Sequence, residues 1–563
     1  MSSPKQIELQ DDGWLRWAQN EECFYPLPFA GDINGTHDPG DELQGEADLP
    51  RTVIELKMNS LSSALRDKPS WIQKSQNPSI IAKWREEILM QQEGLPEENQ
   101  LTHSMVDYVL AELAGYAKLF DKATGIEMGC CERVWKSDSL ISTGLCDTLL
   151  KCVARLEDVP DGKKDWHPNS NNQVLDLVHP SLYPLVYGRT RVYEKDGAGN
   201  LLPTKHPQLL EHQWGMADFD TDVSGKATLA SPYINNLDRR KHGMLYKVIE
   251  HLIGAAVPMW NRVLSDLRRP LTPPRVETSL IRLTYADSFV LEYIGVPCIW
   301  GGGRESLHPC PLEGDYDDNE YDAWLRTQPK RLLQGLAKYD GALDMIKQTI
   351  DLSNSRIQVI VKFANIVLTP DKPDYPGGPW HVEGMKNESI VSTFTYYYDE
   401  ENITESHLAF RTAIRDPIYH DQDDRVCMDI YYMDQLGNDM AFIQHRGYIV
   451  TKGGRCIAFP NIYEHQVQPF DLVDKNKPGH QKIVTLFLID PTRKIISTTD
   501  VPPQHREDYC NLLMRAPTVQ RLPPELHLLI CKQVKEGFTR EEAEEFRLDW
   551  MKRGLMARDG LDE

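Results

Sequence analysis

Three residues in the second half of the chain have side chains that could together bind a metal ion. His381 and Glu383 lie in the stretch "GGPWHVEGMKNE", residues 377–388. If this stretch is a β-strand, both side chains point to the same face, because side chains alternate along a strand. His465 follows about 84 residues after His381, in "GRCIAFPNIYEHQVQPF". That segment predicts a strand, a Pro-Asn turn and a second strand that carries the histidine.

Two imidazoles and one carboxylate form the facial triad of non-haem iron(II) oxygenases. Three protein ligands on one side of the iron leave positions for a bidentate cosubstrate and for dioxygen, which a closed site with four protein ligands would not. Two other carboxylates lie close by, Glu388 and Glu464. Their odd spacing from the histidines would turn them to the opposite face of a strand, so we expect them to be solvated or to support the ligands from behind.

The region around these residues is predicted to be rich in short β-strands. Runs of apolar, β-branched and aromatic residues are separated by Gly, Asn, Asp and Pro turns, which is typical of an antiparallel sandwich or barrel. The runs are "RIQVIVKFANIVLTP", "SIVSTFTYYYD", "HLAFRTAI", "AFIQHRGYIVT", "GRCIAFPNIYEHQVQPF" and "QKIVTLFLID". A double-stranded β-helix of the jelly-roll or cupin kind would bring strands that are distant in sequence together around the metal.

Helical patterns flank this region on both sides. We predict an irregular arm and a helical cap in residues 1–160, a double-stranded β-helix core with helical insertions in residues 161–500, and a helical tail in residues 501–563. The tail contains "TREEAEEFRLDWMKRGL", in which Thr539 and Glu542 form a capping box. The predicted fold class is therefore α+β.

Composition excludes several classes of protein. The chain has 563 residues, 40% of them hydrophobic, with 62 basic and 84 acidic residues and a net charge of −22. Nucleic-acid and anionic-membrane binders need a positive surface, so neither is an expected partner. No signal peptide or membrane-spanning run is visible, and the eleven scattered cysteines read as free thiols of a reducing compartment. We expect an intracellular, cytoplasmic protein; the sequence leaves its oligomeric state open.

Longer strings resemble known families. "PWHVEGMKNESI" followed by "AFPNIYEHQVQPF" resembles the Jumonji-type branch of the 2-oxoglutarate and iron(II)-dependent oxygenases. More of the chain resembles DUF4246, a large fungal family of unknown function. That resemblance is carried by "VKFANIVLTPDKPDYPGGPWHVEGM", "YYYDEENITESHLAFR", "GHQKIVTLFLIDPTRKIISTTDVPPQ", "WHPNSNNQVLDLVHPSLYPLVYGRTRV", "DKPSW" and "SPYINNL".

The resemblance implies that His381, Glu383 and His465 are ligands of iron(II), and that 2-oxoglutarate is the cosubstrate. This acid needs a cation for its distal carboxylate. Lys482, at the start of the last strand, and Arg411 are the candidates; an Arg that often precedes the lysine in such enzymes is replaced here by Gln481. Further predicted cosubstrate contacts are Asn365, Tyr396 and Tyr398.

Predicted substrate contacts are Trp380, beside the first histidine, and Tyr233, Asn235 and Asn236 in "YINN". The substrate is expected to be a small molecule or a peptide, which would be hydroxylated, desaturated or demethylated. A cupin-like metal enzyme without 2-oxoglutarate, acting as a direct dioxygenase, an isomerase or a hydrolase, remains an alternative. So do a Jumonji-like protein hydroxylase or demethylase and a scaffold that has lost turnover.

Overall fold

The computed structural model describes most of the chain between residues 48 and 562. The ranges outside the description are chiefly 1–47, 196–211, 277–337 and 415–442, apart from short pieces within them. Most of the irregular arm predicted at the start of the 1–160 range therefore lies outside the described residues.

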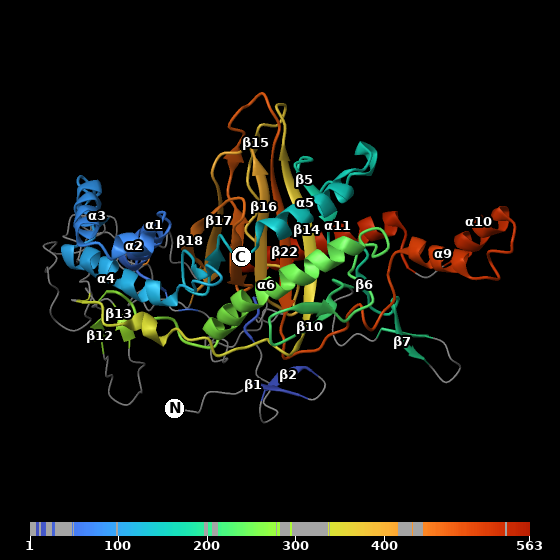
Figure 1. Ribbon diagram of the computed structural model, residues 1–563, viewed down its shortest axis with the longest axis horizontal. Coiled ribbons are helices and arrows are strands. Elements are labelled where there is room, and N and C mark those ends of the chain that lie inside the picture. Colours follow the sequence, from blue (N-terminus) through green and yellow to red (C-terminus); the bar gives the residue numbers. More distant parts are fainter. Residues whose placement is uncertain are drawn as a thin grey trace, which may run out of the picture.

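Five helices precede the main run of strands: α1 (Val53–Arg66), α2 (Trp71–Ser75), α3 (Pro78–Gln91), α4 (His103–Leu119) and α5 (Thr143–Glu157). Their starts follow local capping chemistry, since the hydroxyl groups of Thr52, Thr102 and Ser142 each accept a hydrogen bond from a backbone N–H in the first turn. The four helices α1 to α4 gather at one end of the molecule (Figure 1).

The central element is a nine-stranded antiparallel sheet with the strand order β11-β10-β14-β22-β16-β19-β4-β3, in which β5 also pairs with β14. Its long strands are β14 (Arg356–Leu368), β16 (Ile390–Glu401) and β22 (Gly479–Ile489). Its shorter strands are β3 (Glu127–Met128), β4 (Trp135–Ser137), β5 (Val174–Val178), β10 (Ala217–Thr221), β11 (Ala227–Leu229) and β19 (Cys456–Pro460). Strands β3 and β4 come from the region that was predicted to be a helical cap.

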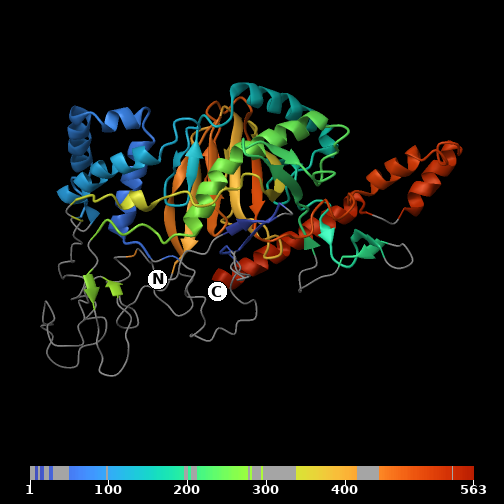
Figure 2. The ribbon, with the colours of Figure 1, turned by 60° about the horizontal axis from the view of Figure 1, so that its bottom comes forward.

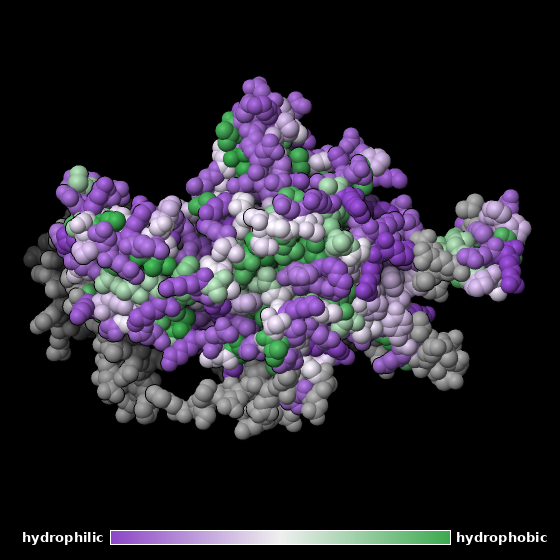
Figure 3. Space-filling view, in the orientation of Figure 1, coloured by the Kyte–Doolittle hydropathy of each residue, from purple (hydrophilic) through white to green (hydrophobic). Residues whose placement is uncertain are grey.

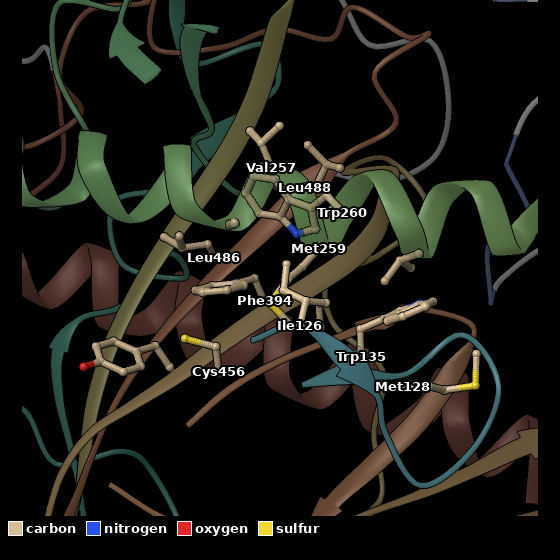
Figure 4. Packing of buried hydrophobic residues seen from close by; sticks show 14 of the residues in the cluster. Ile126, Met128, Trp135, Val257, Met259, Trp260, Phe394, Cys456, Leu486 and Leu488 are labelled. Carbon is tan, nitrogen blue, oxygen red and sulfur yellow. The ribbon is translucent and has the colours of Figure 1, made fainter. Parts of the chain in front are cut away.

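Helix α6 (Gly243–Leu267) crosses one face of this sheet, and Figure 2 shows it lying over the strands. The helix is mostly apolar, and its buried residues form the main hydrophobic core together with those of the sheet. In that core, Trp260 is completely buried and packs near Phe394 of β16, together with Leu486 and Leu488 of β22 (Figure 4).

The other face of the main sheet packs against a three-stranded sheet with the order β18-β17-β20. Its strands are β17 (Ser406–Ala413), β18 (Ile443–Thr451) and β20 (Tyr463–Val467). A second core cluster, which includes Phe410, Tyr463, Phe459 and Tyr397, joins the two sheets. The two sheets remain separate, so the described strands form antiparallel layers rather than a closed barrel.

The remaining described elements are short or lie at the periphery. Two-stranded ribbons pair β1 (Ile7–Leu9) with β2 (Leu15–Trp17), β6 (Leu185–Val186) with β9 (His212–Gln213), β7 (Arg191–Lys195) with β8 (Leu201–Pro203), β12 (Ser279–Ile281) with β13 (Tyr293–Gly295), and β15 (Asp374–Tyr375) with β21 (Phe470–Asp471). Single 3-10 turns occur at Asp161–Lys163 and Ala342–Met345.

The tail contains α9 (Arg506–Arg515), α10 (Pro524–Gln533) and α11 (Arg540–Asp562), of which α9 and α10 project away from the body (Figure 1). The predicted capping box is confirmed, because Glu542 N donates to Thr539 Oγ1 and Thr539 N donates to the Glu542 carboxylate. Most of the face seen in Figure 3 is hydrophilic. None of the helices in the described part of the chain combines the length and apolar character needed to cross a membrane.

The mixture of helices and antiparallel sheets predicted from the sequence is confirmed. The six apolar runs predicted as strands between residues 355 and 490 correspond to strands, from β14 to β22, whereas residues 377–388 do not form one. The predicted helical cap contains α1 to α5, and α6 is a helical insertion in the predicted core range. The three predicted domain ranges remain a prediction, although the main core is continuous from α1 to the central sheet.

Candidate metal centre

The three residues predicted as metal ligands lie together, between the two sheets. Glu383 Oε1 is 3.6 Å from His381 Nε2 and 3.5 Å from His465 Nε2, and the two imidazole rings have their centroids 4.3 Å apart. His465 and Glu383 are almost fully buried, whereas His381 is about one-third exposed. The histidine ring of β20 also contacts Phe459 of β19, with centroids 4.8 Å apart. The site therefore joins the small sheet to the main one.

The backbone of this site differs from the predicted strand. Residues 376–389 form no strand; His381 instead makes an isolated antiparallel bridge with His465. Its N–H donates to the carbonyl of His465 over 3.2 Å, and the N–H of His465 donates back over 2.9 Å. This reciprocal pair holds the two imidazoles side by side. The chain then turns at Gly384, whose φ of +71° is accessible to glycine without steric cost.

Asn461, in the turn between β19 and β20, fixes the carboxylate residue. Its Oδ1 accepts from Glu383 N over 2.9 Å, and its Nδ2 donates to the carbonyls of Glu383 and Ile390 over 2.8 Å and 3.2 Å. Asn461 is only 1% exposed. The side chain thus ties the segment that carries Glu383 to the strand pair that carries His465, and it is a residue that spacing alone did not identify.

The pKa shifts of the buried ligands favour the protonation states that bind a cation. Burial alone would raise the pKa of Glu383, but the positive charge of Lys362 and the neighbouring imidazoles hold it well below its ordinary value. Burial and the neighbouring His381 lower the pKa of His465 to about 4. At neutral pH the site therefore contains a carboxylate and a neutral buried imidazole, which are the protonation states that metal ligands require.

The spacing of the three ligand atoms fits a metal ion. Two protein atoms that each lie about 2.1 Å from one ion are roughly 3.0 to 3.4 Å apart. The separations of 3.5 and 3.6 Å are close to this range and longer than an ordinary hydrogen bond. His381 Nδ1 is anchored to the carbonyl of Pro379 at 2.9 Å, as the second nitrogen of a metal-bound histidine usually is. His465 Nδ1 has no hydrogen-bond partner among the described residues, so packing holds that ring.

A lysine that was not predicted lies on the same face of the main sheet. Lys362 of β14 stands opposite Thr485 of β22, which in turn stands opposite Thr395 of β16. Opposed residues share a face, so the three side chains form one row across three strands. Their sequence neighbours Phe363 and Val484 pack on the α6 side, so the row points toward the small sheet.

Lys362 is half-buried and has no hydrogen bond or close ion pair with any residue that the structure describes. Its charge nevertheless affects both Glu383 and His465. A signal for this residue exists in the sequence, because its lysine is the only charged residue in the mostly apolar run "IQVIVKFANIVL". Runs of this kind belong to strands buried on both faces, where a lone charge requires an explanation.

Most of the predicted cosubstrate residues lie on the opposite, helix-covered face of the main sheet. Lys482 Nζ is 3.1 Å from Glu157 at the end of α5, and Asn365 Nδ2 donates to the same carboxylate over 2.6 Å. Tyr398 donates to Asn365, and Tyr396 belongs to the core beneath α6. The structure brings Lys482, Asn365 and Tyr398 together around Glu157 and not around the three ligands.

Arg411 also has another partner. Its guanidinium group forms an ion pair with Glu464 and lies 4.8 Å from the ring centre of Trp380. Arg411 and Glu464 alternate with the inward-facing Phe410 and His465, so they point away from the metal ligands. Trp380, next to His381 in the sequence, therefore packs with Arg411 on the outer side of the small sheet.

The remaining predicted contacts serve neighbouring backbone groups. Tyr233 donates to the carbonyls of residues 501 and 502, Asn235 to that of Leu182, and Asn236 to that of His179. Glu388, the other nearby carboxylate, is fully buried and accepts from the N–H groups of Trp214 and Met385. The structure thus places these four residues in loop-closing hydrogen bonds.

Comparisons with solved structures give only distant likenesses. One is an iron(II)/α-ketoglutarate-dependent dioxygenase, TqaL, with 12% identity, 29% of this chain and 55% of that chain covered, and a TM-score of 0.17. Another is IDO from Bacillus thuringiensis, with 8% identity, coverages of 26% and 52%, and a TM-score of 0.17. A bsmA homologue from Methylobium petroleophilum PM1 has 9% identity, coverages of 24% and 43%, and a TM-score of 0.15.

The chain thus spans about half of the length of these structures, and the similarity to oxygenases is weak and of low coverage. No curated protein matches the chain. Two family models do. The model described as "Domain of unknown function DUF4246, N-terminal" matches residues 5–87, and the model described as "Protein of unknown function (DUF4246)" matches residues 103–511. Since these matches cover most of the sequence, the chain belongs to the DUF4246 family.

Proposed function

We propose that this protein is a non-haem iron(II) oxygenase that uses 2-oxoglutarate as cosubstrate. The observation that carries the proposal is the convergence of His381, Glu383 and His465 between two antiparallel sheets, with ligand atoms 3.5 and 3.6 Å apart. Two histidines and one carboxylate are the ligand set of this enzyme class. The two facing sheets also support a double-stranded β-helix as the fold of the core.

Iron(II), when bound by these three residues, would supply the coordination positions at which the cosubstrate and dioxygen react. The chain's own contribution is to hold the ligands. The His381–His465 backbone pair sets the spacing of the imidazoles, and Asn461 fixes the segment that carries Glu383. Burial of Glu383 and His465 keeps bulk water away from two of the three ligands.

Lys362 is the cation that we propose for the distal carboxylate of 2-oxoglutarate, in place of Lys482 or Arg411. The other two candidates already form ion pairs with Glu157 and Glu464, whereas Lys362 has no such partner among the described residues. A half-buried ammonium group next to hydroxyl groups is a suitable site for a carboxylate. Thr485 and Thr395, in the same cross-strand row, could donate the additional hydrogen bonds.

The proposed substrate is a small molecule or a peptide. A net charge of −22 would repel nucleic acids and anionic membranes. We also propose that the protein acts inside the cell. The seven cysteines in the described part of the chain are all free, which fits a reducing compartment.

The first experiment measures binding and turnover together. Anaerobic equilibrium dialysis should show one equivalent of 2-oxoglutarate bound in the presence of Fe(II). When the loaded protein is then exposed to air, succinate should form. The variant His381→Ala should lose Fe(II)-dependent succinate formation. Unchanged iron binding at this site and unchanged succinate release in H381A would contradict the assignment. Metal binding without any binding of 2-oxoglutarate would favour the cupin-like alternative.

The second experiment separates the candidate cations. Lys362→Met should weaken 2-oxoglutarate binding roughly 10- to 100-fold, because a charge-assisted hydrogen bond contributes about 1.5 to 3 kcal/mol. Metal affinity should change much less. Lys482→Met serves as the matched control, since its ammonium group is already paired with Glu157. Equal 2-oxoglutarate affinity in wild type and K362M would exclude Lys362 from the role.

A further inference from the structure

A second group of metal-ligating side chains lies outside the triad. His167, Asp176 and His179 each present one ligand atom, and these atoms all lie within 4.8 Å of one another. Both histidines precede a proline, and such pairs ordinarily mark turns. In the structure the two turns flank strand β5, which carries Asp176, and thereby bring the three side chains together.

The carboxylate of Asp176 has an oxygen available for an ion. Its side chain is 1% exposed. Oδ2 lies 2.8 Å from His167 Nδ1, but Oδ1 is buried and has no hydrogen-bond partner among the described residues. A buried, unpartnered carboxylate oxygen costs free energy that a bound cation would remove.

His179 is anchored through its Nδ1 atom. Its Nδ1 lies 2.6 Å from Ser181 Oγ and 3.2 Å from Ser181 N, so the ring is anchored through one nitrogen. For Nε2 to bind an ion, the proton of the neutral ring must lie on Nδ1 and be donated to Ser181 Oγ, in place of the hydrogen bond from Ser181 N. The ring centroids of His167 and His179 are 5.2 Å apart. His179 is almost fully buried, whereas the side chain of His167 is about one-quarter exposed, which leaves a route for an ion on that side.

Two positively charged side chains lie near the group and would lower its affinity for a metal ion. Arg547 of α11 reaches Asp176 Oδ2 at 3.5 Å, but both of its terminal nitrogens are bonded to Asp165, at 3.2 and 3.0 Å. Lys362 influences Asp176 and His179 electrostatically. Neither cation occupies Asp176 Oδ1. The 2.8 Å contact between His167 and Asp176 is a hydrogen bond, so an ion would displace its proton and widen the pair by a few tenths of an ångström.

We propose that His167, Asp176 and His179 bind a second divalent transition-metal ion, separate from the ion of the triad. Two imidazoles and one carboxylate form a nitrogen and oxygen ligand set that suits Zn²⁺. The ion would bind one residue in the turn before β5, one within β5 and one after it. It would therefore fix this edge strand, which pairs with β14 close to Lys362.

The test counts metal ions in the whole protein with either site disabled. Protein stripped with a chelator is reconstituted with Zn²⁺ alone, and bound zinc is measured by mass spectrometry after gel filtration. Wild type should retain two equivalents, His381→Ala/His465→Ala should retain one, and Asp176→Asn/His179→Ala should retain one. Zero equivalents in the triad variant, or two in the D176N/H179A variant, would overturn the proposal.

A milder variant covers the case in which the double variant at the buried positions does not fold. His167→Ala alters the partly exposed ligand and should weaken the second equivalent of zinc at least 10-fold, as measured by competition with a chromogenic chelator. His251→Ala, at an exposed histidine of α6, is the matched control and should leave both equivalents unchanged. If H167A and H251A bind the second equivalent of zinc with equal affinity, the proposal is also overturned. This test requires no 2-oxoglutarate and no turnover, so its outcome is independent of the proposed oxygenase activity.

Discussion

At the scale of single residues, the amide of Asn461 is a main determinant of the metal centre. It satisfies both backbone groups of Glu383 and links them to β16 through Ile390. Glu383 lies in a segment that is not part of a strand, and among the described side chains its backbone is bonded by Asn461. The carboxylate depends on this amide for its position relative to the two histidines.

Asn461→Ala should lower metal affinity roughly 10- to 100-fold, as loss of a group that orients a ligand typically does. The measurement is a competition titration with a chelator of known affinity. Asn461→Asp keeps an acceptor for Glu383 N but loses the donor, so its affinity should be intermediate. Circular dichroism spectra should remain native in both variants. If N461A binds metal as tightly as wild type, Asn461 does not position Glu383.

Glu388 should give the protein a pH-dependent stability. Burial raises its pKa to about 7 from an ordinary value of 4.5, so the folded state favours the neutral acid. The stabilisation of the folded state that comes from protonated Glu388 is fully present below about pH 4.5. It is lost as the pH rises through about 7. Glu388→Gln cannot titrate. The unfolding free energy of wild type minus that of E388Q should therefore fall by about 3 kcal/mol between pH 4.5 and 8, in urea titrations. A constant difference would show that Glu388 titrates normally.

At the scale of secondary-structure elements, the sequence predicts what depends on local pattern. Alternating and continuous apolar runs identify β14, β16 and β22, and helical spacing identifies α4 and α6. The metal ligands are identifiable because residue type and spacing restrict the chemistry. Lys362, by contrast, becomes interpretable only through its strand neighbours, since Thr485 lies 123 positions further along the chain.

The sequence also could not show that the two predicted cations form ion pairs away from the metal ligands. Lys482 and Arg411 lie on strands of the right region, but the face on which a side chain emerges depends on register. A shift of one residue exchanges the two faces, and the alternation within β22 places Lys482 beneath α5. Likewise, residues 376–389 read as a strand in isolation, but they bridge only at His381 because Asn461 and Gly384 redirect the chain.

The contact between α6 and the main sheet should dominate local stability. Trp260 is completely buried between this helix and the strands. Trp260→Ala should lower the unfolding free energy by about 3 to 5 kcal/mol, since it removes a large side chain from a packed core. Met244→Ala at the start of the same helix is the control, because Met244 is 61% exposed and its loss should cost within about 0.5 kcal/mol. Chemical denaturation of both variants measures this difference. Similar values for the two would mean that α6 is not anchored through Trp260.

At the scale of the whole molecule, metal binding should contribute to stability because the ligands come from segments about 80 residues apart. A ligand that binds only the folded state adds about 2.7 kcal/mol when its concentration is 100 times Kd. Anaerobic Fe(II) should therefore raise the melting temperature of wild type. In His381→Ala the rise should be smaller, because one of the three triad ligands is missing. Identical shifts in the two proteins would place the responsible iron outside the triad.

The position of β22 in the sheet has a consequence for how the protein is made. This strand lies between β14 and β16 and pairs with both, yet it is the last of the described strands along the chain, at Gly479–Ile489. On the ribosome, β14 and β16 are therefore synthesised long before the strand that joins them, and each exposes an unpaired edge during that time. Residues 1–478 are all synthesised before the core can close, so production in a heterologous host should respond strongly to chaperone supply and to slower translation.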